Sequence, residues 1–232
     1  PSQLPKGERM RLLTDGASNP KTAKSSEYGY LTGILHLAPH IQSGYQVCAS
    51  ASPGCSSQCL YFQGRGRMTT VQQARIRKTK LYFENREKFL ADLIKDVSSL
   101  VRRADKNNLK ACVRLNGTSD IRWESTGIMD LFPSTVFYDY TKHKNRKRLP
   151  KNYSLTFSRS EVTTNADIDQ AISNGMNVAV VFNDELPKFW NGLEVIDGTT
   201  HDLRFLDPKP CIVGLVAKGT AKKDLTGFVV SP

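Results

Sequence analysis

The chain has 232 residues, of which 39% are hydrophobic and 9% aromatic, and 33 Lys and Arg against 22 Asp and Glu give a formal net charge of +11. This composition excludes a disordered or collagen-like chain and predicts a single globular domain. No uncharged apolar stretch approaches the roughly 20 residues of a membrane span, and the N-terminus lacks the apolar core of a signal peptide. We therefore expect a cytoplasmic protein without a membrane partner.

The N-terminal residues, up to about residue 25, are rich in Lys, Ser, Thr, Gly and Pro and predict an irregular arm. A first strand is expected over Tyr30–Leu37, followed by a loop to about Gln63 that holds three of the five cysteines. Apolar residues then recur at helical spacing between Thr69 and Lys106, which predicts a long helical region with one apolar stripe.

Short apolar segments alternate with polar or helical pieces in the rest of the chain. Helices are expected over Ser125–Phe132 and Asn165–Asn174. The further predicted strands are Ala111–Leu115, Thr135–Tyr140, Tyr153–Phe157, Asn177–Phe182, Leu193–Ile196 and Cys211–Leu215. This alternation predicts an α/β fold with mostly parallel strands. About seven strands with several short connections favour an irregular or incomplete (β/α) barrel, with a doubly wound open sheet as the alternative.

Polar and aromatic side chains follow most of the predicted strands, at the ends where the loops of an α/β barrel form its site. Arg122 is a candidate for binding an anionic group, with Asp120 or Glu124 orienting it or moving a proton. An ion-pair lattice between strands is an equal interpretation of these charges. The full set of candidate catalytic residues is Asp120, Arg122, Glu124, Asp139, Tyr140, Lys142, Arg159, His201 and Asp202.

The later members of this set have specific expected roles. Tyr140 beside Lys142 is a candidate proton donor, or packs without a chemical role. Arg159 stands between two serines in a segment that could grip a small anionic ligand. His201, close to Asp202, is a candidate proton carrier or metal ligand, although a hydrogen-bonded structural histidine is the common outcome.

Cys48, Cys55 and Cys59 lie in the segment VCASASPGCSSQCL with the spacing C-x6-C-x3-C. The Ser-Pro-Gly turn before Cys55 folds this segment back, and a four-residue separation places Cys55 and Cys59 on one side of a helical turn. In a reducing cytoplasm, converging thiols indicate a metal site or catalysis rather than a disulfide.

The absence of any C-x2-C pair makes a closed structural zinc site the weaker interpretation. Three thiolates without an evident fourth ligand fit a [4Fe–4S] cluster with one open iron. Unliganded thiols remain the other alternative. The candidates for a fourth ligand are His36, His40, Cys112 and Cys211.

The position of the cysteines, after the first strand and before the first long helix, resembles the architecture of radical S-adenosylmethionine enzymes. Those enzymes carry the motif C-x3-C-x2-C in a partial barrel, which this chain lacks. The Asn-Gly-Thr segment that begins at Asn116 is the part of this chain that is most similar to their methionine-binding segment. S-adenosylmethionine is therefore a candidate cofactor whose use the motif leaves open.

Distinctive segments also recur along almost the whole chain. They are YLTGILHLAP from residue 30, ASPGC from 51, GRGR from 64, QQARIRKT from 72, VRLNGTSDIRWE from 113, FYDYTK from 137, LTFSRSE from 155, NVAVVF from 177 and HDLRFLDP from 201. Together they resemble the gene product 88 family of tailed bacteriophages. The resemblance implies a phage-encoded protein that acts in the host cytoplasm, and it implies little about a reaction.

Three functions stay open from these observations. The first is an iron–sulfur protein, acting as a redox or radical enzyme or as a cluster-dependent regulator. The second is a nucleic-acid-binding protein with a structural metal, because the chain has two acid-free basic clusters that attract polyanions. They are residues 142–151 (KHKNRKRLPK) and the set Arg65, Arg67, Arg75, Arg77, Lys78 and Lys80. These clusters are equally interpreted as a solvated face. The third is a module that binds a host protein.

Overall fold

A sheet of ten strands forms the centre of the computed structural model, which describes residues 9–15 and 24–232. The strand order is β1-β2-β3-β4-β5-β6-β9-β8-β7, and β10 pairs with β6 off this path. The strands are β1 (Leu13–Asp15), β2 (Tyr30–Leu35), β3 (Lys110–Arg114), β4 (Val136–Thr141), β5 (Tyr153–Ser158), β6 (Asn177–Phe182), β7 (Phe189–Trp190), β8 (Leu193–Asp197), β9 (Ile212–Val216) and β10 (Val229–Val230).

Most neighbouring strands run parallel, and only the β1–β2 and β7–β8 pairs are antiparallel. The α/β class with mostly parallel strands is therefore confirmed. Among the described strands none joins β1 to β7, so the sheet stays open rather than closing into a barrel. Two strands pair with different parts of β6: β5 pairs with residues 177–179, and β10 pairs with residues 181–182.

The described helices are α2 (His40–Ser43), α3 (Pro53–Ser57), α4 (Thr69–Glu84), α5 (Arg86–Lys106) and α6 (Asn165–Ser173), with short 3-10 helices η2 (Lys24–Tyr28), η3 (Leu60–Phe62), η4 (Gly64–Arg67), η5 (Trp123–Thr126), η6 (Arg204–Leu206) and η7 (Gly219–Lys223). The predicted helical region after residue 69 is confirmed, but it forms two helices. Asn85 separates them because its side chain accepts a hydrogen bond from the Lys88 N–H at 3.0 Å and so caps α5.

The two helices expected in the second half of the chain fare differently. Residues 165–173 form α6, whose capping box joins Thr164 and Asp167. The helix expected over residues 125–132 is wrong, since the chain forms only the 3-10 turn η5 followed by turns. Gly127 ends that turn with φ of 71°, a left-handed conformation that does not continue a helix.

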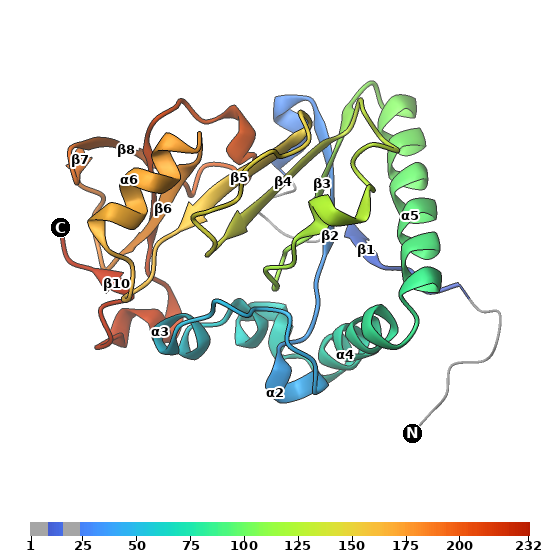
Figure 1. Cartoon of the computed structure of the whole chain (residues 1–232), viewed down its shortest axis with the longest axis horizontal. Coiled ribbons are helices and arrows are strands. Elements are labelled where there is room, and N and C mark those ends of the chain that lie inside the picture. The colour runs from blue at the N-terminus through green and yellow to red at the C-terminus, as the bar shows by residue number, and fades with distance from the viewer. Residues whose placement is uncertain (1–8, 16–23) are drawn as a thin grey trace.

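The two faces of the sheet carry different layers. Helix α5 packs on β1, β2 and β3, and α6 packs on β6, so these helices cover the face that holds the main apolar core (Figure 1). Phe137 and Leu155 point into this core, whereas Tyr138, one residue further along β4, belongs to a smaller cluster on the opposite face. Short helix η6 covers part of that second face.

The N-terminal arm is more ordered than the composition predicts. Residues Leu13–Asp15 form β1, which pairs antiparallel with β2 and packs against α5. The apolar residues Leu12 and Leu13 drive this pairing, since both are buried. The remaining parts of the expected arm, residues 1–8 and 16–23, lie outside the described residues.

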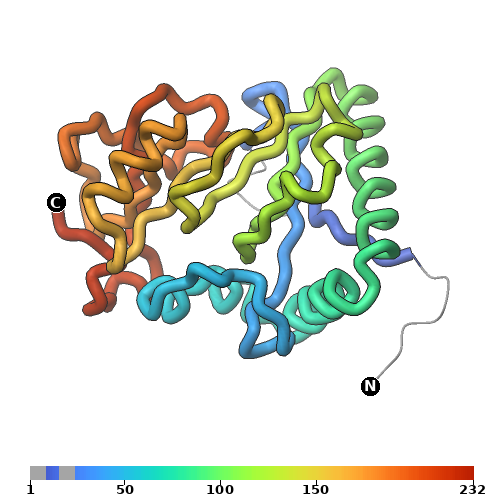
Figure 2. The backbone as a smooth tube through the Cα atoms, in the orientation of Figure 1, coloured from blue at the N-terminus to red at the C-terminus, as the bar shows by residue number. Residues whose placement is uncertain are grey.

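The carboxyl ends of the parallel strands form one edge of the sheet, and the chain between β2 and α5 passes along it. Figure 2 shows this segment, which includes α2, α3 and α4, running below the sheet from one end of the molecule to the other. The three clustered cysteines lie in this segment, so the fold brings them next to the loops that follow β3, β4 and β5. No described helix is long and apolar enough to cross a membrane.

Candidate functional site

The three cysteines occupy a short, irregular part of the edge segment. Cys48 lies before α3, Cys55 lies within α3, and Cys59 directly precedes η3 as its N-cap residue. The expected turn before Cys55 is an N-cap, in which the Ser52 hydroxyl accepts a hydrogen bond from the Cys55 N–H at 3.2 Å. All three thiols are free and half-buried.

Glu161, in the loop after β5, anchors this segment to the sheet. Its carboxylate accepts hydrogen bonds from the Ser52 hydroxyl at 2.8 Å and from the Gly54 N–H at 2.7 Å. Gly54 is required by this approach, because a Cβ there would lie 2.6 Å from the Glu161 carboxylate oxygen. From the other side, the Asp120 N–H donates to the Val47 carbonyl at 2.8 Å. Loops from two strands therefore hold the cysteine segment.

The pKa values of the three thiols are all raised, and burial is the largest cause in each case. The pKa of Cys48 rises to about 12, because the Asp120 carboxylate and the other two thiols add to the effect of burial. Neutral thiols therefore prevail at pH 7, and none of the three is a preformed reactive thiolate. A cation bound between them would reverse this preference.

Positive groups and backbone N–H groups surround the same sulfur atoms. A backbone hydrogen bond from Asp120 lowers the pKa of Cys48 against the effect of burial, and one from Tyr61 does so for Cys59. The Lys142 ammonium acts on the pKa of Cys55 in the same direction. These are the groups that would stabilise negative charge on sulfur.

The thiols are near neighbours, but the described residues contain no group of three or more His, Cys, Asp or Glu side chains that could hold a single metal ion. Among the candidates for a fourth ligand, His40 is exposed, whereas Cys112 and Cys211 are buried. Cys112 is buried in β3 and contacts the Thr32 hydroxyl at 3.2 Å, and Cys211 packs in an apolar cluster beside β9. Burial lowers the pKa of His36 to about 3, with Arg75 and two other cations in support, so its imidazole is neutral.

Asn116 organises the loop after β3 instead of presenting its amide to a ligand. Its side-chain oxygen accepts hydrogen bonds from the Ser119 hydroxyl at 2.8 Å, the Ile121 N–H at 2.9 Å and the Trp123 indole N–H at 3.0 Å. The backbone N–H of Asn116 donates to Asp139 at 2.6 Å. This set of bonds fixes the position of the loop that carries Asp120 and Arg122.

Asp139 is buried within β4. It also accepts a hydrogen bond from the Tyr153 hydroxyl at 2.8 Å. Burial raises the pKa of Asp139 to about 7, although the Asn116 N–H and nearby arginines favour its charged form. A carboxyl that titrates near neutrality is suited to proton transfer, but this one faces protein groups on both oxygens.

Arg146 sits at the centre of an ion cluster beneath the cysteine edge. Its guanidinium donates to both oxygens of Glu124, with the Nε to Oε1 bond at 3.0 Å. It also lies 3.6 Å from Asp120. The Arg146 side chain is 0% exposed, so this member of the predicted surface cluster 142–151 is an internal residue. Glu124 and Asp120 are thus committed to an ion-pair lattice, one of the two interpretations given for them.

Lys142 and Arg159 are held mainly by backbone oxygens. The Lys142 ammonium donates to the Ser158 carbonyl at 3.0 Å, to the Ser158 hydroxyl at 2.9 Å and to the Arg159 carbonyl at 3.0 Å. The Arg159 guanidinium donates to the Gly227 and Phe228 carbonyls, which ties the loop after β5 to the C-terminal segment. This tether uses one nitrogen of the Arg159 guanidinium, and the binding of an anion by Arg159 stays a prediction.

A comparison with known families bears on this arrangement. The family model described as gene product 88 matches residues 11–232. The chain belongs to the gene product 88 family. No curated protein and no solved structure matches this family member. The family is one of bacteriophage gene products, which confirms the resemblance carried by the motifs.

The other predicted site residues of this family member form a second cluster on the opposite face of the sheet. Arg114 donates to Asp202 at 2.8 Å and lies 4.8 Å over the ring of Tyr140. Arg204, which is fully buried, donates to the His201 carbonyl at 2.6 Å. Burial and Arg204 lower the pKa of His201, which leaves its ring neutral. Tyr140, His201 and Asp202 therefore belong together, but apart from the cysteine edge.

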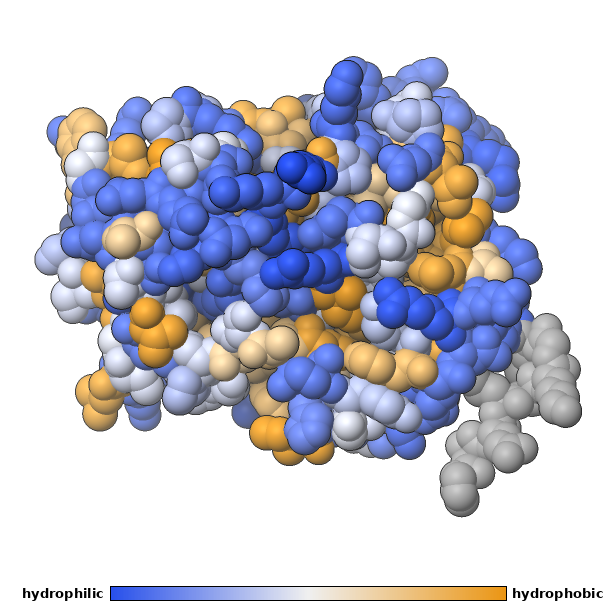
Figure 3. Space-filling view, in the orientation of Figure 1, coloured by the Kyte–Doolittle hydropathy of each residue, from blue (hydrophilic) through white to orange (hydrophobic). Residues whose placement is uncertain are grey.

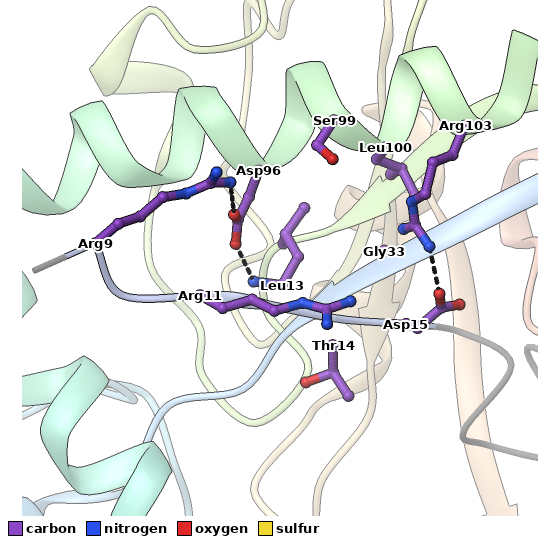
Figure 4. A pocket seen from close by; sticks show the side chains of 10 residues that line it. All are labelled: Arg9, Arg11, Leu13, Thr14, Asp15, Gly33, Asp96, Ser99, Leu100 and Arg103. Atoms are coloured by element: carbon purple, nitrogen blue, oxygen red, sulfur yellow. Dashed lines mark hydrogen bonds and ion pairs between the residues drawn. The ribbon is translucent and has the colours of Figure 1, made fainter.

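A cavity of about 540 Å³ lies between β1 and α5 (Figure 4). Its charges are largely satisfied internally. Arg9 pairs with Asp96 at 2.6 Å, and Arg103 pairs with Asp15 at 2.6 Å. These ion pairs connect the segment around β1 to α5. The cavity therefore lies between two packed elements, away from the carboxyl ends of the strands.

Sequence reasoning missed two residues that shape the cysteine edge. Glu161 stands in a polar segment directly after a predicted strand, which was the available signal for its role. Arg146 gave none, because a lysine- and arginine-rich segment does not reveal which of its members turns inward.

Proposed function

We propose that this protein binds an iron–sulfur cluster of the [4Fe–4S] type through Cys48, Cys55 and Cys59. The observation that carries the proposal is that the three half-buried thiols of one anchored segment lie close enough to raise the pKa of Cys48. They do so at the carboxyl edge of a parallel sheet, where α/β proteins bind their ligands.

A cubane cluster requires less close convergence of the three thiols than a single metal ion does. In a cubane cluster each thiolate binds a different iron, so the ligands stand further apart than around one metal ion. The residues that follow Cys55 directly are two serines, which are small. The missing fourth cysteine fits a cluster with one iron open to a substrate or to a non-cysteine ligand.

The chain's own groups would set the properties of such a centre. The backbone N–H groups of Asp120 and Tyr61 are placed to donate to sulfur, and Lys142 adds positive charge near Cys55. Hydrogen bonds to sulfur and local charge are the main controls of cluster potential. A bound cluster would supply one-electron chemistry, in a redox or radical enzyme or in a cluster-dependent regulator, with S-adenosylmethionine as the candidate co-substrate.

The test is an anaerobic preparation analysed for iron, acid-labile sulfide and visible absorption. We expect a brown protein with about four irons per chain for this cluster type. Cys48→Ala, Cys55→Ala and Cys59→Ala should each lose most of the iron, whereas the matched control Cys112→Ala should keep it. A colourless wild-type protein, or equal iron in all four variants, would refute the proposal. A spectral change on adding S-adenosylmethionine would decide its use.

Nucleic-acid binding is the alternative function, and exposed basic residues would carry it. In the cluster 142–151, Arg146 is internal and Lys144 pairs with Asp167. The exposed basic residues that remain near the cysteine edge include Arg65 and Arg67 in η4. Salt-sensitive binding of a DNA or RNA duplex that falls with Arg65→Gln and Arg67→Gln, but survives loss of iron, would favour this alternative. Capture of a host protein that survives both changes would favour a binding module.

A further inference from the structure

A second cavity of about 340 Å³ opens beside the cysteine segment. It lies between Ser50, the loop after β4 and the loop that joins β5 to α6. The face of the molecule drawn in Figure 3 is mostly hydrophilic, and its hydrophobic residues are scattered rather than joined in one patch. The cavity has both charged and apolar residues in its lining, which indicates a small ligand with a charged group and an apolar part.

The charged residues that line the cavity are mostly basic. They are Arg122, Lys142 and Lys144, with Asp167 as the one carboxylate. Lys144 pairs with Asp167, whose other oxygen accepts from the Thr164 N–H at the start of α6. The three N–H groups of Lys142 are taken up by oxygens of Ser158 and Arg159, so this residue contributes a fixed positive charge in the wall.

Arg122 differs from the other cations because its guanidinium is not engaged. Within the described part of the chain no hydrogen bond or ion pair joins the Arg122 side chain to another residue, and the residue is exposed at the rim of the cavity. A guanidinium presents two parallel N–H donors that match the two oxygens of a phosphate or a carboxylate. An exposed arginine without a protein partner, at the rim of a cavity with two lysines in its lining, is therefore available to hold an oxyanion.

The other walls define the rest of the ligand. His143 and Ser50 lie next to each other, with Nδ1 and Oγ at 3.2 Å, and offer polar contacts on the side of the cysteines. Phe157 and Val162 give an apolar wall on the side of β5 and α6. The volume is at the lower limit of small-molecule sites, which excludes a large cofactor.

We propose that this cavity binds a small molecule through a phosphate or carboxylate group held by Arg122, with an apolar part of the molecule against Phe157. The inference deepens the proposed function, and rests on it, in naming the substrate class that would be held beside the cluster. The binding step itself needs no cluster, since its contacts come from Arg122, His143 and the two apolar residues.

The test uses three probes that share one ring: phenyl phosphate, benzoate and phenol. Dissociation constants are measured by ligand-observed NMR on the full chain at constant ionic strength. We expect at least one of the two anions to bind about tenfold or more tightly than phenol, and Arg122→Gln to weaken it by a similar factor. The stronger of the two anions identifies the group. Arg65→Gln, which removes an exposed arginine elsewhere, should change nothing.

Asn145→Asp provides a second variant that leaves the packing intact. Asn145 is exposed and lines the cavity, so an added negative charge there should weaken anion binding several-fold, whereas Asn191→Asp on the β7–β8 turn should not. Thermal unfolding of each variant shows whether it is folded. The proposal is overturned if phenol binds as well as the anions, if neither anion binds, or if Arg122→Gln and Asn145→Asp both leave binding unchanged.

Repeating the titration with Cys48→Ala separates the two proposals. Anion binding by a chain without iron would keep the cavity assignment and, if the wild-type chain also lacks iron, refute the cluster. Iron in the wild-type chain without anion binding would refute the cavity assignment alone.

Discussion

Replacing Arg146 with glutamine should destabilise the protein strongly, even though its neighbours in the sequence look like a solvated basic surface. The Arg146 side chain is fully enclosed, donates to both oxygens of Glu124 and lies 3.6 Å from Asp120. It also contacts the Tyr153 hydroxyl at 3.3 Å. Removing the guanidinium leaves two carboxylates close together without their shared cation.

The size of the effect follows from the burial of these carboxylates. Only 7% of the Asp120 side chain and 19% of the Glu124 side chain are exposed, so water replaces the lost partner poorly. Breaking a buried ion pair from one side costs about 3–5 kcal/mol of unfolding free energy. Arg146→Lys should cost less than Arg146→Gln, because it keeps the charge and loses only the two-pronged contact.

Urea unfolding followed by tryptophan fluorescence measures this cost, since Trp123 is buried next to Glu124. Lys147→Gln is the matched control, because Lys147 is exposed and its change should stay within about 0.5 kcal/mol. If Arg146→Gln and Lys147→Gln shift the unfolding free energy equally, Arg146 is not internal and the reasoning fails.

Three further variants test the edge of the sheet. Asn116→Ala should lower the unfolding free energy by about 3 kcal/mol, because it leaves the Trp123 indole N–H buried without an acceptor. A loss of less than about 1 kcal/mol in a urea titration would contradict this expectation. Asp139→Asn should flatten the pH dependence of the unfolding free energy. The raised pKa of about 7 means that folded wild type still holds a proton that the unfolded chain releases near pH 4, so wild-type stability falls by up to about 4 kcal/mol between pH 4 and 7. The same pH profile in the variant and the wild type would refute the assignment. Gly54→Ala should displace the Glu161 carboxylate, lower the unfolding free energy by about 1–3 kcal/mol and reduce the iron bound by the cysteine segment. If the melting temperature and the iron content stay unchanged, the close approach of Glu161 to residue 54 is not needed.

Local patterns in the chain were sufficient for much of the fold. The apolar runs of β4, β5 and β6 mark strands because branched and aromatic residues favour extended backbone, and the Thr164–Asp167 pair marks the start of α6. The spacing of Cys48, Cys55 and Cys59 singled out the segment at the edge of the sheet. The break at Asn85 and the turn at Gly127 were harder to foresee, because each depends on one residue overriding a longer periodicity.

The family, the α/β class and the mostly parallel strands could thus be predicted from short sequence patterns. Tertiary structure alone decided which polar residues meet: Asp139 and Tyr140 are neighbours in β4 yet point to opposite faces, so one faces Asn116 and the other Arg114. It also turned Arg146 inward while Lys147 stayed in solvent. The physical reason is that a charge is buried only where distant parts of the chain bring an opposite charge and hydrogen-bond partners to it, and no local pattern records that meeting.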